Sequence, residues 1–249
     1  MSGHSKWATI KHKKGAADAK RGKLFAKLAR QIEVASRAGG GDVDMNPTLR
    51  TAVQKAKGAS MTNDAIDRAI KRGTGESGGE SYEDIMYEGY APGGVALLID
   101  VLTDNRNRTS ADLRNILSKM GGSMAEPGAV GWQFSRRGVV LVEGSVDEDE
   151  LMLAALEAGA DDVSGSGDAW TVTCDPSDTF EVKEALEAAG YTVVSADMPM
   201  VSDNLVPVDS VEDAKKLLRI LDAIEDNDDV QDVYSNFDIS DDVMEAASA

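Results

Sequence analysis

The hydrophobic period of this chain changes at a glycine-rich segment, residues 73–80 (GTGESGGE). Before this segment, apolar residues recur at helical spacing; after it, short apolar runs typical of strands alternate with helical segments. A stretch so rich in glycine and serine is typical of a flexible linker. The sequence therefore predicts a helical unit followed by units that combine helices and strands, which is an α+β fold class.

Helices are predicted at three places before the linker. The first covers residues 16–38, with an apolar side formed by Leu24, Phe25, Leu28, Ile32 and Ala35 and a basic side formed by Lys20, Lys23, Lys27, Arg30 and Arg37. The second begins at Asn46 and Pro47, an N-cap residue followed by proline in the first helical position, and stops near Gly58. The third is capped by Thr62 and ends at Gly73.

Strands and helices alternate after the linker. Strands are expected at residues 82–90, 94–102 and 129–134, with a helix from Thr109 or Ser110 through Met120. Residues 138–196 then follow the order β-α-β-β-α-β, which is the ferredoxin-like order. A strand at 200–206, a helix at 211–224 and a strand at 230–237 complete a second such unit around the first, and residues 238–249 are predicted to fray.

The predicted architecture has three domains. Residues 1–75 form a basic arm and a small helical domain. Residues 81–135 together with 199–249 form a split α+β domain, and residues 136–198 form an inserted one. Both α+β domains are expected to be ferredoxin-like, one inserted in the other. A content of 42% hydrophobic and 28% charged residues is that of a globular protein able to build such cores.

Charge reverses its sign at the same linker. Residues 1–72 contain 16 Lys and Arg against 6 Asp and Glu, a net charge of +10. The remaining residues contain 10 basic and 38 acidic side chains, a net charge of −28, and the whole chain carries −18. Because salt screens exposed charges beyond about 10 Å at 0.1 M, a basic segment held apart from acidic domains keeps its own attraction for polyanions. This asymmetry points to nucleic acid as the partner.

The candidate binding residues lie in the arm and on the first helix. Their density is self-repelling unless counter-charge is near, and a phosphate backbone supplies that charge with release of counterions. Trp7 fits base stacking, and it equally fits an anchor that packs the arm on the helical domain. The predicted nucleic-acid-binding residues are His4, Lys6, Trp7, Lys11, His12, Lys13, Lys14, Lys20, Arg21, Lys23, Lys27 and Arg30.

Other kinds of site find no support in the sequence. His4 and His12 are the only two histidines, and with Cys174 remote they have no zinc spacing, so no metal, cofactor or catalytic residue is predicted. The glycine-rich segment lacks the Lys-Ser/Thr of a P-loop. With no membrane-length apolar run, no secretory signal and a single cysteine, we expect a cytoplasmic, non-enzymatic protein without a small-molecule substrate, a monomer or weak oligomer.

Three further charged segments have more than one interpretation each. Residues 103–109 (TDNRNRT) form a second nucleic-acid or ribosome contact, a charged hinge or, as we prefer, turn and capping chemistry with Thr109 as the helix cap. Arg136 and Arg137 form a phosphate clamp or, preferably, surface charge. The acidic run at residues 225–229 (EDNDD) is interpreted as a solvated helix end rather than a cation site.

The sequence resembles the YebC family. The resemblance rests on residues 3–7 (GHSKW), 10–14 (IKHKK), 18–23 (DAKRGK), Asn46-Pro47 with Leu49, residues 87–90 (YEGY) and residues 103–108 (TDNRNR), and it covers nearly the whole chain. It implies three domains, one helical and two α+β, with no catalytic residue and no cofactor. Ala91 stands where the family often has glycine, which affects only the local turn.

The family resemblance leaves two functions open. The family is described as bacterial DNA-binding transcriptional regulators, and it also includes a mitochondrial translational activator and members implicated in ribosome-associated translation. A long basic arm with an aromatic residue suits ribosomal RNA slightly better, whereas the family description favours DNA. Both functions use the same mechanism, which is neutralisation of phosphates by the first domain. An enzyme with an unrecognised site between the nested domains ranks last.

Overall fold

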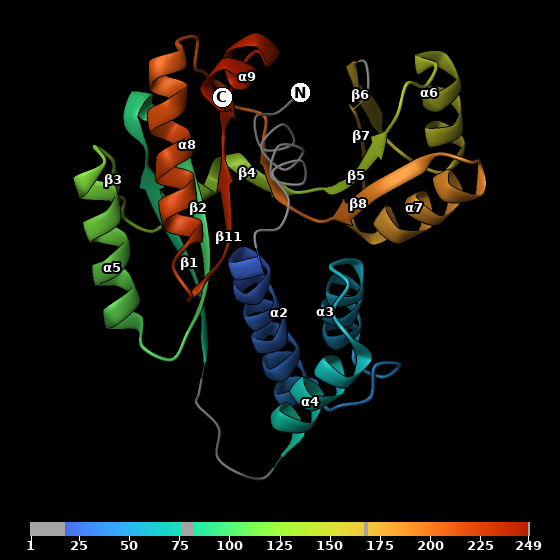
Figure 1. Cartoon of the computed structure of the whole chain (residues 1–249), viewed down its shortest axis with the longest axis horizontal. Helices are drawn as coiled ribbons and strands as arrows, with labels where there is room; N and C mark the ends of the chain where they lie inside the picture. Colours follow the sequence, from blue (N-terminus) through green and yellow to red (C-terminus); the bar gives the residue numbers. More distant parts are fainter. Residues whose placement is uncertain (1–17, 76–81, 167–168, 249) are drawn as a thin grey trace.

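The computed structural model of this chain describes residues 18–75, 82–166 and 169–248, and residues 1–17, 76–81, 167–168 and 249 lie outside that description. The linker core and the basic arm predicted from the sequence are therefore in the part that is not described. Helices α2 (Asp18–Gly39), α3 (Pro47–Gly58) and α4 (Asn63–Thr74) form the helical domain, which lies below the two sheet-containing parts in Figure 1.

The helical domain has its own core, and the sequence predicted most of it. Leu28, Ile32 and Ala35 of α2 are buried against Leu49 and Val53 of α3. Leu24 is an exception, since it is 46% exposed. Helix α4 approaches α2 closely because Gly73 has no side chain: a Cβ there would collide with the carbonyl oxygen of Glu33.

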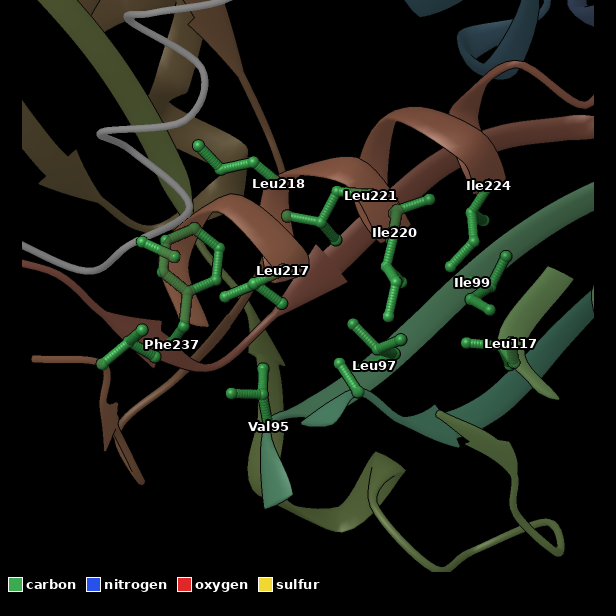
Figure 2. Close-up of a cluster of buried hydrophobic side chains, with 14 of the residues drawn as sticks. Val95, Leu97, Ile99, Leu117, Leu217, Leu218, Ile220, Leu221, Ile224 and Phe237 are labelled. Atoms are coloured by element: carbon green, nitrogen blue, oxygen red, sulfur yellow. The ribbon is translucent and has the colours of Figure 1, made fainter. Parts of the chain in front are cut away.

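The middle domain is built on a four-stranded antiparallel sheet. Its strands β1 (Glu83–Tyr90), β2 (Ala96–Thr103), β3 (Ser123–Met124) and β11 (Val230–Ser235) have the order β11-β2-β1-β3. Helices α5 (Arg106–Lys119) and α8 (Val211–Glu225) cover one face. Figure 2 shows Leu97 and Ile99 of β2 facing Leu217 and Ile220 of α8, and all four side chains are buried. The structure thus confirms that helices lie near residues 109–120 and 211–224, as the sequence predicted.

The predicted strand at residues 129–134 is wrong. Residues Gly131–Gln133 form the 3₁₀ helix η2, and β4 (Phe134–Arg136) pairs with β9 (Met200–Ser202) instead of joining the main sheet. The cause is the buried carboxylate of Glu88, which accepts the backbone N–H groups of Gly128 at 2.6 Å, Val130 at 2.5 Å and Gly131 at 2.8 Å. Donors committed to a carboxylate cannot pair in a strand ladder.

Two other boundaries differ from the prediction. Helix α5 begins at Arg106, because the Asn105 side chain accepts the N–H of Arg108 and caps the helix, so Thr109 is not the cap. Residues 238–249 were predicted to fray, yet Asp241–Ser248 forms helix α9, whose Met244 is 3% exposed and completes the core of the middle domain. Two short strands, β10 (Val206–Pro207) and β12 (Phe237–Asp238), form a parallel pair outside the main sheet.

The inserted unit follows the predicted order. It comprises β5 (Gly138–Glu143), α6 (Glu148–Glu157), β6 (Asp162–Ser166), β7 (Ala169–Cys174), α7 (Thr179–Ala188) and β8 (Thr192–Asp197). The sheet order is β6-β7-β5-β8 with antiparallel neighbours, which confirms the ferredoxin-like order for this unit. Cys174 is fully buried in its core, and burial raises the pKa of the thiol, consistent with a structural role.

The buried side chain of Asn46 gives a direct test of the helical domain. Its Nδ2 donates to the carbonyls of Ala35 and Gly40, both at 2.9 Å, while its Oδ1 accepts the N–H of Leu49 at 3.1 Å. We expect Asn46→Ala to lower the free energy of unfolding of this domain by about 2–4 kcal/mol, because two buried polar groups and one partly buried carbonyl lose their partner. Hydrogen exchange of the α2–α4 amides measures this loss.

Thr62 supplies the control for that experiment. It precedes α4 as the N-cap residue, but its side chain makes no capping hydrogen bond. Thr62→Ala is therefore expected to change the stability of the same domain by less than about 0.5 kcal/mol. Equal losses in the two variants would contradict the role given to the Asn46 side chain.

Candidate nucleic-acid interface

The predicted binding residues divide into two groups. His4, Lys6, Trp7, Lys11, His12, Lys13 and Lys14 lie outside the described residues. Lys20, Arg21, Lys23, Lys27 and Arg30 lie on α2, which runs up to the loop between α8 and β11 (Figure 1). The guanidinium of Arg21 lies 5.3 Å from the ring centre of Phe25, which explains why a cation can share the apolar side of this helix.

Three of the α2 cations contact an acidic loop of the middle domain. We define the acidic loop as residues 225–229, the run EDNDD at the end of α8. Lys23 Nζ lies 3.2 Å from both the backbone oxygen and Oδ1 of Asp226, and Lys27 Nζ donates to the backbone oxygen of Glu225 at 2.6 Å. Arg30 Nη1 donates to the backbone oxygen of Asp228 at 3.0 Å. The run is therefore the exposed helix end that the sequence suggested at Asp226 and Asp228, and it is also a contact surface for α2.

The attraction has two physical sources. The last carbonyls of an α-helix have no partner within the helix, and the aligned peptide dipoles place partial negative charge there. Lys23 and Lys27 supply donors and positive charge at this end of α8. The carboxylates of the acidic loop add full negative charges to the same surface. The basic side of α2 thus meets the most electronegative end of α8.

Asp229 is the innermost contact of the acidic loop. Its side chain is only 8% exposed. One oxygen, Oδ2, accepts from Thr109 at 2.6 Å, Arg108 at 2.7 Å and Thr103 at 3.2 Å, and Oδ1 accepts from Arg30 at 3.3 Å. Burial raises the pKa of this carboxyl, but these hydrogen bonds and the charge of Arg108 lower it by more, so the net pKa lies below the ordinary value.

The motif at residues 103–108 therefore builds a structural junction. Arg108 pairs with both Asp104 and Asp229, each at 2.7 Å, and these bonds raise the pKa of its guanidinium. The hydroxyl of Thr109 is buried against Asp229 rather than capping α5. Turn chemistry was the preferred interpretation of this segment, and its side-chain contacts also join β2, α5 and the acidic loop.

A polar crevice opens beside this junction. Its volume is about 320 Å³, and its walls include Arg30, Tyr82, Arg108, Asp112 and Asp228. The Arg30 guanidinium lies 5.0 Å from the ring centre of Tyr82, the first described residue after the linker. Arg30 also donates to the carbonyl oxygen of Leu102 at 3.2 Å. Arg30 is thus held by an aromatic face, backbone oxygens and one carboxylate.

A second contact joins the helical domain to the other face of the sheet. Lys55 Nζ of α3 lies 3.7 Å from Asp232 Oδ2 of β11. Asp232 is paired directly with Asp100 of β2, so two carboxylates lie side by side on this face. Burial, then Asp84, then Asp232 raise the pKa of Asp100 to about 6, while Lys55 and Arg136 lower it. Asp232 in turn raises the pKa of Lys55.

Other cations of the helical domain face solvent. Lys57, Arg68 and Lys71 are exposed, and their side chains form no hydrogen bond or ion pair with another described residue. Arg72 contacts Glu33 at 3.6 Å and is 62% exposed at its side chain. In the inserted region, Arg136 is exposed and donates to the carbonyl of Met198, which fits surface charge. The helical domain therefore keeps free positive charge away from the acidic loop.

Sequence reasoning missed the acidic loop as a partner of α2. The available signal was the complementary spacing of charge: cations at positions 23, 27 and 30 on one helix side, and a dense acidic run at residues 225–229. What the sequence lacks is any indication that segments about 200 residues apart come together. Glu88, whose carboxylate organises residues 128–131, was also missed. Nothing in the motif at residues 87–90 (YEGY) indicates that this glutamate is buried.

Comparison with known proteins now bears on this geometry. The profile described as TACO1/YebC protein N-terminal domain matches residues 5–76, and the profile described as TACO1/YebC second and third domain matches residues 82–237. The chain belongs to the TACO1/YebC family. The boundary between the two matches falls in the glycine-rich segment at which period and charge change.

Relatives are similar along their whole length. A protein of Halothermothrix orenii is 58% identical over 248 residues, and one of Rubrobacter xylanophilus is 59% identical over 247 residues; each alignment covers 98% of both chains. Both are named "Probable transcriptional regulatory protein". The crystal structure of a conserved hypothetical protein from Aquifex aeolicus is 43% identical, with a TM-score of 0.79 over 91% of this chain and 93% of that one.

Two other kinds of site are absent from residues 18–75, 82–166 and 169–248. Within these ranges, no helix has both the length and the apolar character that a membrane crossing requires. The same ranges contain no group of three or more His, Cys, Asp or Glu side chains arranged to hold a metal ion. His4 and His12 lie outside them.

The raised pKa of Asp100 predicts a pH-dependent stability. The folded chain holds this proton up to about pH 6, whereas an unfolded chain releases it near about pH 3.9, so stability falls as pH rises through this window. We expect Asp100→Asn to raise the free energy of unfolding by about 1–2 kcal/mol near neutral pH and to give no gain below about pH 4. The gain is less than the full shift, because Asn also loses the attraction of Lys55.

Urea unfolding of the variant and the parent chain at the two pH values measures this effect. Asp209→Asn is the matched control, since that carboxylate is exposed and has no partner among the described residues. A gain in Asp100→Asn that is the same at both pH values would contradict the role of the paired carboxylates.

Proposed function

We propose that this protein is a non-enzymatic regulator of gene expression that binds DNA through phosphate contacts of its basic N-terminal domain. The observation that carries the proposal is the charge of residues 1–72, which is +10 in a chain of net charge −18. A polyanion gains counterion-release free energy from such a segment and little from the acidic remainder. The names of the relatives, probable transcriptional regulatory proteins, support transcription as the process.

The described residues define which cations are available for this role. Lys57, Arg68 and Lys71 face solvent on α3 and α4, and the lysines of the arm precede α2 in the chain. Lys23, Lys27 and Arg30 are already engaged by the acidic loop. We therefore assign the main phosphate contacts to the arm, with the α2 cations contributing once they leave the acidic loop.

The engagement of α2 favours a second candidate function, a ribosome-associated translation factor that binds ribosomal RNA. A DNA duplex can bind along the basic side of α2 only if the contacts of α2 with the acidic loop break, because both use the same cations. An arm that contains lysines and Trp7 can contact RNA phosphates and unpaired bases while α2 stays docked. The two candidates therefore differ in whether α2 must separate from the middle domain.

Neutralising the arm tests the binding proposal. Lys11→Gln, Lys13→Gln and Lys14→Gln together are expected to weaken nucleic-acid binding about tenfold or more at low salt, and to reduce the slope of log K against log salt by about 2–3. Titration of a fluorescent DNA duplex at several salt concentrations measures both quantities. The circular dichroism spectrum is expected to stay unchanged.

A matched variant removes the same charge elsewhere. Lys119, Lys215 and Lys216 are exposed lysines of the middle domain, and replacing all three by Gln is expected to leave the affinity within about twofold of the parent chain. Unchanged affinity in the arm variant, or an equal loss in both variants, would contradict the assignment of the phosphate contacts to the arm.

Sedimentation of a cell lysate, with sequencing of the nucleic acid bound to the protein, separates the two candidates. Enrichment of promoter DNA in slowly sedimenting fractions is expected for the transcriptional regulator. Co-migration with ribosomes and recovery of ribosomal RNA would reject the transcriptional regulator in favour of the translation factor.

A further inference from the structure

The cations on α2 have two anionic partners to choose between. In the described structure their partner is the acidic loop, and the proposed function requires some of them to contact phosphate. We infer that the acidic loop is an internal competitor for nucleic acid, which occupies Lys23 and Lys27 in the free chain and is displaced when nucleic acid binds. This inference rests on the proposed function, because it concerns the regulation of that same surface.

The acidic loop offers α2 the same chemistry as a phosphate backbone. Every acceptor that it presents to the three α2 cations is an oxygen. Those of the Asp226 and Asp229 carboxylates carry negative charge, and the backbone oxygen of Glu225 carries the partial charge of a helix end. The cations lie at positions 23, 27 and 30, a spacing that places them on one side of the helix. A phosphate chain running along this side would meet the same donors.

The outer contacts are weak enough to exchange. The side chains of Lys23 and Asp226 are 46% and 63% exposed, so water and salt screen their 3.2 Å pair. An exposed ion pair of this kind contributes little to stability. A nucleic acid that gains counterion-release free energy from each cation can outcompete such a pair. The outer part of the acidic loop is therefore the part that is displaced.

The inner end of the loop can survive the loss of α2. If Arg30 leaves Asp229, the carboxylate still accepts from Arg108, Thr103 and Thr109. No buried charge is left without a partner, so separation avoids the large penalty of breaking a buried ion pair. Asp229 therefore stays anchored to β2 and α5, and the loop can take back α2 when the nucleic acid dissociates.

Removing the outer carboxylates tests this competition. Asp226→Asn with Asp228→Asn leaves Asp229 and the backbone oxygens in place. We expect the double variant to bind a mixed-sequence DNA duplex about three- to tenfold more tightly than its control at low salt, with the difference shrinking as salt rises. The same titration with a single-stranded RNA shows whether the competitor acts on both nucleic acids.

The control variant corrects for the change in overall charge. Glu181→Gln with Glu184→Gln removes two exposed carboxylates from α7 of the inserted unit, far along the chain from α2, and neither side chain has a hydrogen bond or ion pair with another described residue. A gain over this control with either probe supports the competition. Equal affinities of the two double variants for both probes would overturn it, and thermal melting checks that both chains remain folded.

Failure of the inference can be told apart from failure of the proposed function. If the parent chain binds the probes and the arm variant binds them more weakly, but Asp226→Asn with Asp228→Asn matches its control, the competition is overturned and the binding function stands. If the parent chain binds neither probe at low salt, the proposed function falls, and the inference falls with it.

Discussion

The carboxylate of Asp229 is the interaction on which the arrangement of the domains depends, because it joins β2 and α5 of the middle domain to α2 of the helical domain. It accepts hydrogen bonds from Thr103, Arg108 and Thr109, which fixes the end of β2 and the start of α5 against the loop after α8. It also accepts from Arg30, which brings in the helical domain. A buried carboxylate is stable only when its oxygens are satisfied, and here those donors come from both domains. One side chain thus couples the core of the middle domain to the position of α2.

This coupling changes the meaning of the divided charge. A front segment of +10 and a remainder of −28 suggested a basic surface for a polyanion, held apart from a separate acidic part of the chain. The structure shows that part of the positive side is already engaged by the acidic end of α8, since Lys23 pairs with Asp226 and Lys27 donates to the backbone oxygen of Glu225. The charge of the chain therefore serves its own domain packing as well as its partners. Within the described residues, Lys57, Arg68 and Lys71 remain available to solvent.

Local patterns predicted local structure well. The amphipathic period identified α2, the Asn46-Pro47 pair marked the start of α3, and alternating runs gave the order of the inserted unit. The prediction failed where a side chain from elsewhere takes over the backbone, as Glu88 does at residues 128–131. It failed again at the acidic loop, because contacts between segments about 200 residues apart leave no periodic signal. It failed a third time at α9. The polar composition of residues 238–249 suggested fraying, but Met244 is buried in the core of the middle domain, which orders the helix.

Hydrogen exchange in the acidic loop tests the central claim most directly. The claim is that α2 exchanges the acidic loop for nucleic acid, so the amides of residues 226–230 should lose protection when the intact chain binds a DNA duplex. Faster exchange there, together with slower exchange along the basic side of α2, is the predicted result. Unchanged or stronger protection of the loop in the saturated complex would contradict it, because α2 would then still be held by the middle domain.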